Sequence, residues 1–445
     1  MIRKTANGRY TLPEEKELTS EKLQEFVWAH SMDVQDRWQK LGDAYKNKAA
    51  ILRQPKKAPY KPDNRIATNL PRYITDVFEG FFDGIPVRTE ADDKKVSEYV
   101  ELVESYNGMD DVNAELSRMA SIYGHAYDMY FVDNDGQIGV TCLSPVDAFM
   151  VYDESILERP RFFVRVYRDS DNVLRGSLSD DTYVRYFHMS PDITWDEERP
   201  HGFDGVPATE YVQNADRLGI YEGAMSMIEA HSKVLSEKAN DVDYFSDAYL
   251  AVLGAKIKKE DLQAIRDNRI INFAGIGDSK LTVEFLGKPD GDESQEHLID
   301  RLEKLIYQTC MVSNISDENF GSASGIALKY KLHAMSSLAK TKERKFAAGF
   351  GRRWRLICSN PVSGVPADAW VNLHFTFTPN MPASLLEEAQ TAVQLEGIVS
   401  KETQLKVLSI VDNIKEEMDK MDKEDEDLAG GFAHERIAAD AEGID

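Results

Sequence analysis

A glycine- and serine-rich loop that runs directly into a long helical pattern constrains this fold more than any other feature of the chain. The loop is Gly321–Gly325, and the glycines at its two ends free the backbone there. From Gly325 to Cys358, apolar residues recur at three- and four-residue spacing, which predicts one continuous helix. At about 1.5 Å per residue this helix would extend roughly 50 Å, more than a small domain needs. We therefore expect it to cross a subunit or to join two layers.

Three interpretations of the loop differ in function. A nucleotide cradle would need a lysine placed on the phosphates, and the loop contains none. A mobile segment between two helices is favoured, because polar residues such as Asn314 and Asn319 precede the flexible glycines. A plain solvent loop is the remaining alternative.

The composition indicates a soluble globular protein of two or three domains. Of its 445 residues, 42% are hydrophobic, so a sizeable core is expected. No run of about 18 uncharged apolar residues occurs, and the N-terminus lacks the apolar segment of a signal peptide, which predicts neither a membrane span nor secretion. Cys142, Cys310 and Cys358 lie far apart, which argues against a disulfide framework and fits a reducing cytoplasm.

The net charge of −24 argues against a protein that grips nucleic acid, because tight binding needs cations that displace counterions from phosphates. A conduit is a different case. A channel wall along which DNA slides gains from weak contact, so acidity is compatible with surrounding DNA. An acidic protein with a solvated surface is the simpler alternative.

The periodicity predicts an α+β chain that is mostly helical. A β-rich region over about 126–188 follows three helices, and the Asp133–Gly136 segment is expected to be a hairpin turn rather than a calcium loop. Two long helices are expected to flank a small insert that reads strand, helix, strand, strand. The predicted helices cover about 20–52, 66–82, 110–124, 222–245 and 293–311, with two more beginning near 384 and 400. The predicted strands cover 127–132, 139–143, 162–168, 183–187, 249–256, 269–273, 281–285 and 370–377, and the helix of the insert covers 259–267.

The sequence contains none of the usual catalytic motifs. Gly275–Lys280 resembles a phosphate cradle but lacks the adjacent Gly-Lys pair. No Gly-x-Ser-x-Gly, Cys-x-x-Cys or His-Glu-x-x-His pattern occurs. We therefore expect no enzymatic activity, no cofactor and no metal. A metal-dependent DNA-processing enzyme, with a site built from carboxylates distant in sequence, stays open as an alternative.

The predicted long helix is strongly basic in an otherwise acidic chain. Nine cations lie between Lys329 and Arg355, against Glu343 alone. We favour contact with an acidic surface of a neighbouring subunit, while DNA contact and a solvated surface remain open. The candidate contact residues are Lys329, Lys331, Lys340, Lys342, Arg344 and Lys345.

Several blocks of the sequence, in this order and spacing, are similar to the siphophage portal protein family of phages that infect Gram-positive bacteria. The blocks are Asn64–Val87, Tyr123–Tyr127 followed by Leu143–Asp147, Ser236–Asn240 leading to Asp247–Leu250, and Ser324–Lys329. The resemblance implies the phage portal fold, with wing, stem, clip and crown, closed into a cyclic ring, a dodecamer. The other virion head structural proteins are the alternative within the same class.

The resemblance implies the following division of the chain. The wing is 1–220, the first stem helix 221–246, the clip 247–290, the second stem helix 291–312, the tunnel loop 313–325, the long wing helix and strand 326–382, the crown 383–428 and a flexible tail 429–445.

The resemblance also implies partners, and it assigns residues to them. A portal at one capsid vertex passes double-stranded DNA during packaging and ejection, and docks the terminase large subunit and later a head-completion (adaptor) protein. It also contacts the major capsid and scaffolding proteins, involves no membrane, and resides in the virion after assembly in the host cytoplasm. The implied DNA-facing tunnel-loop residues are Ser313, Asn314, Ser316, Asp317, Glu318, Asn319, Gly321, Ser322, Ser324 and Gly325. The implied clip contacts are Lys258, Lys259, Asp261, Arg266 and Arg269.

Overall fold

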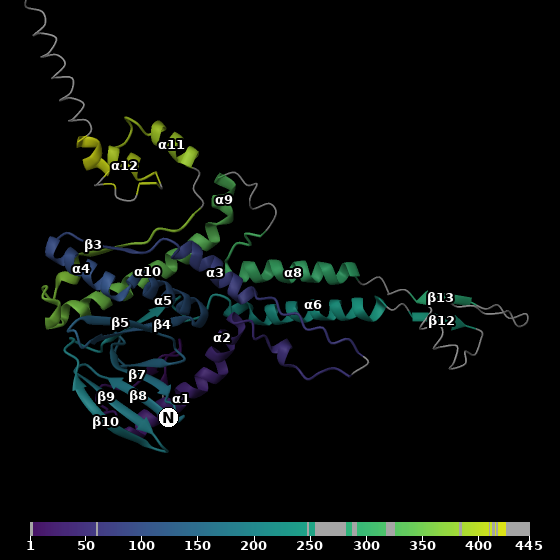
Figure 1. The fold of residues 1–445 in the computed structure, drawn as a ribbon, viewed down its shortest axis with the longest axis horizontal. Coiled ribbons are helices and arrows are strands. Elements are labelled where there is room, and N and C mark those ends of the chain that lie inside the picture. Colours follow the sequence, from purple (N-terminus) through teal and green to yellow (C-terminus); the bar gives the residue numbers. More distant parts are fainter. Residues whose placement is uncertain are drawn as a thin grey trace, which may run out of the picture. The chain divides into compact units, whose positions relative to one another are not determined.

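The computed structural model divides the chain into two units (Figure 1). The larger is Met1–Ser322 with Lys329–Pro379, and the smaller is Ala323–Leu328 with Asn380–Asp445. The structure describes residues 3–58, 61–246, 249–253, 282–286, 292–316, 325–381, 385–408, 410–411, 414 and 417–423.

A seven-stranded sheet forms one half of the larger unit, in the order β1-β2-β6-β7-β8-β9-β10. Its neighbouring strands are antiparallel except β2 and β6, which are parallel. The strands are β1 (Arg3–Lys4), β2 (Tyr10–Thr11), β6 (Ala148–Tyr152), β7 (Pro160–Arg168), β8 (Leu174–Ser179), β9 (Tyr183–Met189) and β10 (Ile193–Pro200). Helix α1 (Ser20–Asp33) packs on this sheet, because Leu23 and Phe26 share a buried core with Phe149 and Phe187.

The first predicted helix is shorter than expected. α1 continues through the π-helical turn η1 (Val34–Trp38) into α2 (Gln39–Tyr45), and the helix ends there instead of reaching residue 52. Asn47 takes a left-handed φ of 57°, which a helix cannot continue through, and a separate 3₁₀ turn η2 (Ala50–Arg53) follows.

A three-stranded sheet in the order β11-β4-β5 and a group of helices form the other half. Its strands are β4 (His125–Val132), β5 (Ile138–Leu143) and β11 (Ala208–Val212), and β4 and β5 form the predicted hairpin. The helices are α3 (Leu70–Phe82), α4 (Lys94–Asn107), α5 (Met109–Tyr123) and α10 (His333–Ser359). α10 packs on β11, since the rings of Phe346 and Phe350 lie 5.2 and 5.6 Å from that of Tyr211.

The strand predicted over 370–377 is only partly a strand. Residues Ala369–Asn372 form the 3₁₀ turn η5, after the turn η4 (Pro361–Ser363), and β14 covers Leu373–Thr376, paired with β3 (Arg88–Ala91). The amide of Val371 donates to the carbonyl of Asp368, so the chain is still turning where the alternating pattern begins.

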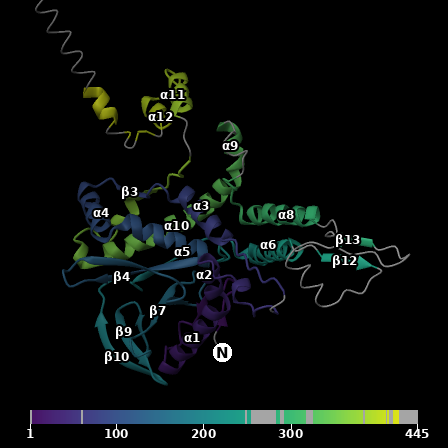
Figure 2. The same cartoon turned by 45° about the vertical axis from the view of Figure 1, so that its right-hand side comes forward.

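Two long helices lie side by side in both views (Figures 1 and 2). They are α6 (Met225–Ser246), which follows the turn η3 (Glu222–Ala224), and α8 (Asp292–Cys310). Between them in sequence, β12 (Tyr249–Leu253) and β13 (Thr282–Leu286) pair antiparallel, as expected for the two outer strands of the insert. The helix and strand predicted at 259–267 and 269–273 lie outside the described residues.

The long helix predicted from Gly325 is broken. α9 (Gly325–Lys331) and α10 are separate, because Leu332 has φ −85° and ψ −5°, and its carbonyl accepts from the Ser336 amide as the cap of α10. The 27 residues of α10 extend about 40 Å rather than 50 Å. The smaller unit contains α11 (Leu385–Gln394) and α12 (Lys401–Leu405), where the two late helices were expected.

Candidate functional site: the helix pair, the basic helix and a pocket

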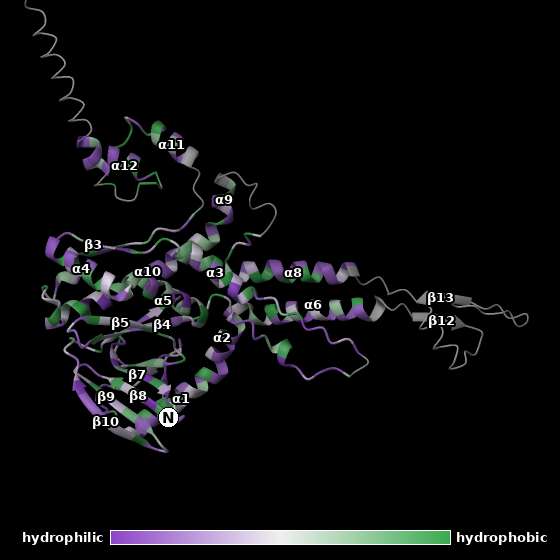
Figure 3. Ribbon diagram, viewed as in Figure 1, coloured by the Kyte–Doolittle hydropathy of each residue, from purple (hydrophilic) through white to green (hydrophobic). Residues whose placement is uncertain are grey.

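The α6–α8 pair is antiparallel and joined by polar contacts along its length. Lys238 forms an ion pair with Glu296, and the Gln295 amide donates to Asp241 at 3.1 Å. Apolar side chains fill the inner face, where Ile306 is wholly buried. Figure 3 shows hydrophilic residues along much of α8. The pair is therefore a rigid two-helix element with a wet outer surface.

A polar strap reinforces α6 near its C-terminal half. The Ser236 hydroxyl lies 2.8 Å from the Ile66 amide and 3.2 Å from the Ile66 carbonyl, so it satisfies both groups. Asn240 accepts from the Asn64 amide at 2.6 Å. The segment before α3 thus runs against α6 and fixes where the helix pair leaves the sheets.

The described start of the predicted tunnel loop is held by hydrogen bonds. The Ser313 hydroxyl donates to the Lys331 carbonyl at 2.8 Å, and the Asn314 amide donates to Glu303 at 3.0 Å. The Ser316 hydroxyl lies 3.0 Å from the Tyr73 hydroxyl. These three residues are anchored at the root of the loop. Of the other predicted loop residues, Gly325 begins α9, and Asp317, Glu318, Asn319, Gly321, Ser322 and Ser324 lie outside the described residues.

Five of the six basic candidates are on the surface, and one is not. Lys329, Lys331, Lys340, Arg344 and Lys345 are exposed. Lys342 is wholly buried, and its ammonium donates to Glu79 at 2.7 Å and to the Ser121 hydroxyl at 3.0 Å. Burial lowers the pKa of the Lys342 ammonium, and the Glu79 carboxylate opposes this shift. Lys342 is therefore removed from the candidate contacts, because α10 directs it inward between α3 and α5.

A second buried ion pair anchors the same helix. Arg353 donates to Asp128 at 2.6 Å, and both side chains are almost completely buried. The Tyr211 hydroxyl donates to the same carboxylate at 2.9 Å. The two inward cations fix the rotation of α10, so the face with Lys340, Arg344 and Lys345 points outward.

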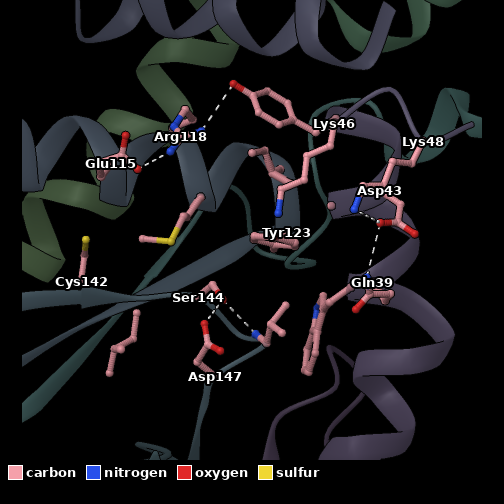
Figure 4. A pocket seen from close by; sticks show the side chains of 17 residues that line it. Gln39, Asp43, Lys46, Lys48, Glu115, Arg118, Tyr123, Cys142, Ser144 and Asp147 are labelled. Atoms are coloured by element: carbon pink, nitrogen blue, oxygen red, sulfur yellow. Dashed lines mark hydrogen bonds and ion pairs between the residues drawn. The ribbon is translucent and has the colours of Figure 1, made fainter. Parts of the chain in front are cut away.

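A pocket lies between α2, α5 and the turn that joins β5 to β6 (Figure 4). It encloses about 560 Å³, within the usual range of binding pockets. Apolar side chains of Trp38, Met119 and Val146 contribute to its lining, and Lys46 and Arg118 stand at its edge. The sequence gave no signal for this pocket, since its residues come from three separate segments.

The clip candidates Lys258, Lys259, Asp261, Arg266 and Arg269 lie outside the described residues. In the described part of the chain, no cluster of three or more His, Cys, Asp or Glu side chains is placed to hold a metal ion. None of the described helices combines the length and apolar character that crossing a bilayer requires.

Two comparisons with known proteins bear on this chain. A family model described as "Phage portal protein, SPP1 Gp6-like" matches residues 24–431. Over 387 residues the chain is 22% identical to a protein named portal protein from Clostridium phage phiCD119, and the alignment covers 80% of this chain and 83% of that protein.

Proposed function

The chain belongs to the phage portal protein family, SPP1 Gp6-like, and on this premise we propose that twelve copies of it close into a ring around the DNA channel. The portal function rests on one observation: the family match runs from residue 24 to residue 431, and so includes the helix pair, the basic helix and both predicted stem connections. Neither comparison favours a DNA-processing enzyme or another head protein.

We propose that α6 and α8 line the channel. The exposed charges of their described side chains are six carboxylates against three cations, so the surface is acidic overall. Such a wall repels phosphates weakly and lets DNA slide instead of holding it. The carboxylates are Glu229, Glu237, Asp243, Glu293, Glu296 and Asp300, and the cations are Lys233, Arg301 and Lys304.

The exposed cations of α10 suit a different contact. Lys340, Arg344 and Lys345 have no ion-pair partner among the described residues of their own chain. In a ring of acidic subunits, the nearest carboxylate-rich surface belongs to the neighbouring copy, and oppositely charged patches fix the register of such an interface. We assign this stripe to subunit contact.

The remaining assignments follow the family's architecture. We propose that the insert between α6 and α8 docks the terminase large subunit and later the head-completion protein, and that the predicted tunnel loop faces DNA. The capsid and scaffolding proteins would surround the ring at one vertex of the virion. The chain itself would carry out no covalent chemistry.

The mass of the purified protein in solution tests this proposal. Twelve copies of the 50.3 kDa chain give a ring of roughly 0.6 MDa, which multi-angle light scattering measures directly. A monomer or dimer at every concentration, even after incubation with scaffolding protein, would refute it. Cleavage of linear double-stranded DNA with magnesium would instead support the enzyme alternative, with EDTA as the control.

A further inference from the structure

An exposed apolar tip stands at one end of strand β6. Ile156 is fully exposed and Leu157 is 67% exposed, and both lie in the loop between β6 and β7. Burial of branched aliphatic side chains is favourable, so two adjacent ones held out in water indicate a surface that binds a partner.

The tip is rigid, which distinguishes it from an ordinary loop. The Asp153 carboxylate accepts from the Ser155 hydroxyl at 2.7 Å and from the Arg159 amide at 2.9 Å. The Glu158 carboxylate, on the far side of the tip, forms an ion pair with Arg9 at 2.7 Å. A segment ordered before binding loses little conformational entropy when it docks.

The pocket of Figure 4 lies at the opposite end of the same strand. Asp147 lines it and immediately precedes β6, whereas the tip immediately follows β6. The five residues of β6 extend about 17 Å, so the pocket and the tip lie at opposite ends of this strand. A head-to-tail ring needs this arrangement, since each subunit must offer complementary features on two different sides.

The chemistry of the two features is complementary. Glu154 and Glu158 flank the apolar tip. The pocket presents apolar side chains, and the exposed Lys46 at its edge has no ion-pair partner among the described residues. An acidic apolar tip thus matches an apolar pocket with a basic edge.

We infer that Ile156 and Leu157 of each subunit insert into the pocket of the next subunit in the ring. The inference rests on the proposed function, because it takes a second copy of this chain as the partner. A tip of two side chains is small beside the 1,200–2,000 Å² or so of a stable interface, so it acts as an anchor within a larger contact.

A native cysteine makes the test direct. Cys142 lines the pocket and is half-buried, while Cys310 and Cys358 are buried. In an Ile156→Cys variant of the full chain, the two sulfurs would come within disulfide range only between neighbouring subunits. Mild oxidation of assembled rings should give a ladder of linked subunits on a non-reducing gel, which disappears on reduction and in the added Cys142→Ser variant. Val371→Cys, at a site 61% exposed, is the matched control and should give no ladder.

A second variant measures the contribution of the tip to assembly. Ile156→Asp should weaken ring formation at least about tenfold in concentration while leaving the circular dichroism and thermal midpoint of the protomer unchanged, because the replaced side chain is exposed. Rings of normal mass in this variant, together with no ladder in the cysteine variant, would overturn the inference and leave the proposed function standing. If such rings then failed to enter capsids, the tip would bind the capsid protein instead. No rings and no ladder in otherwise unaltered protein would overturn both.

Discussion

Replacement of Lys342 by methionine should destabilise the protomer severely. The ammonium of Lys342 is held by the Glu79 carboxylate at 2.7 Å and by the Ser117 carbonyl at 3.0 Å. It also lies 4.8 Å from the ring centroid of Phe82 and 5.2 Å from those of Phe78 and Phe346. Methionine would keep most of the apolar stem but would leave Glu79 with an uncompensated charge, and its side chain is only 13% exposed.

The expected loss is about 3–5 kcal/mol, the usual result of removing one partner of a buried ion pair. Since a protomer of this kind is stable by about 5–15 kcal/mol, urea unfolding followed by tryptophan fluorescence should resolve the change easily. Lys340→Met, on the exposed face of the same helix, is the control and should change stability by less than about 0.5 kcal/mol.

A double variant separates charge from packing. Adding Glu79→Gln to Lys342→Met should recover much of the loss, because the buried carboxylate is then gone. Equal stability of Lys342→Met and Lys340→Met would refute the reasoning. A Lys342→Met protein that is fully stable but no longer assembles or packages DNA would return this lysine to the contact surface.

Three further predictions concern pH, backbone and surface charge. Burial, with a neighbouring carboxylate, raises the pKa of Asp83 from 3.8 to about 7, so the folded state holds this proton more tightly than the unfolded state. Stability should therefore fall as the pH rises from about 4 to about 7, by at most roughly 4 kcal/mol, and Asp83→Asn should flatten the profile in pH-dependent urea unfolding. In Gly124→Ala, at a φ of 88°, the new Cβ would lie 2.0 Å from a backbone oxygen, so thermal unfolding should show at least about 2 kcal/mol more loss than Gly136→Ala, where no atom lies within 4 Å. Reversing Lys340 and Arg344 to glutamate should raise the concentration needed for ring assembly at least about tenfold, and an unchanged concentration in light scattering would place that stripe outside the subunit contact.

The sequence pattern predicted long amphipathic elements better than short ones. The pair of helices flanking a small insert, and the helix α5, were expected from apolar spacing and are present. The two-residue strands β1 and β2 carry too few residues to show a period, and β10 is rich in charge because one edge of its sheet faces solvent. These strands exist because tertiary pairing supplies their partners.

Some missed features did have a local signal. Helix α4 carries Val96, Val100 and Val103 at helical spacing behind Asp93, whose side chain accepts from the Val96 amide as a cap. The inward position of Lys342 was also readable, because it fills the gap between Ala339 and Phe346 on the buried stripe of α10. Such a lysine is more easily taken for a surface cation, since burial demands a partner.

The partners themselves could not be predicted from the sequence. Glu79 lies 263 residues before Lys342, and spacing along the chain does not indicate that α3 and α10 meet. The pocket and the exposed tip have the same character, because each depends on which segments the sheets bring together. Sequence therefore located the stem, the loop and the basic helix, while the sites at which subunits meet required the structure.

A single-particle electron microscopy reconstruction of the purified protein tests the central claim most directly. The account predicts a closed ring of twelve subunits whose central hole is lined by α6 and α8, with the exposed cations of α10 against the neighbouring subunit. A closed ring with the α6–α8 pair on its outer rim, or particles that form no ring under any assembly condition, would contradict it.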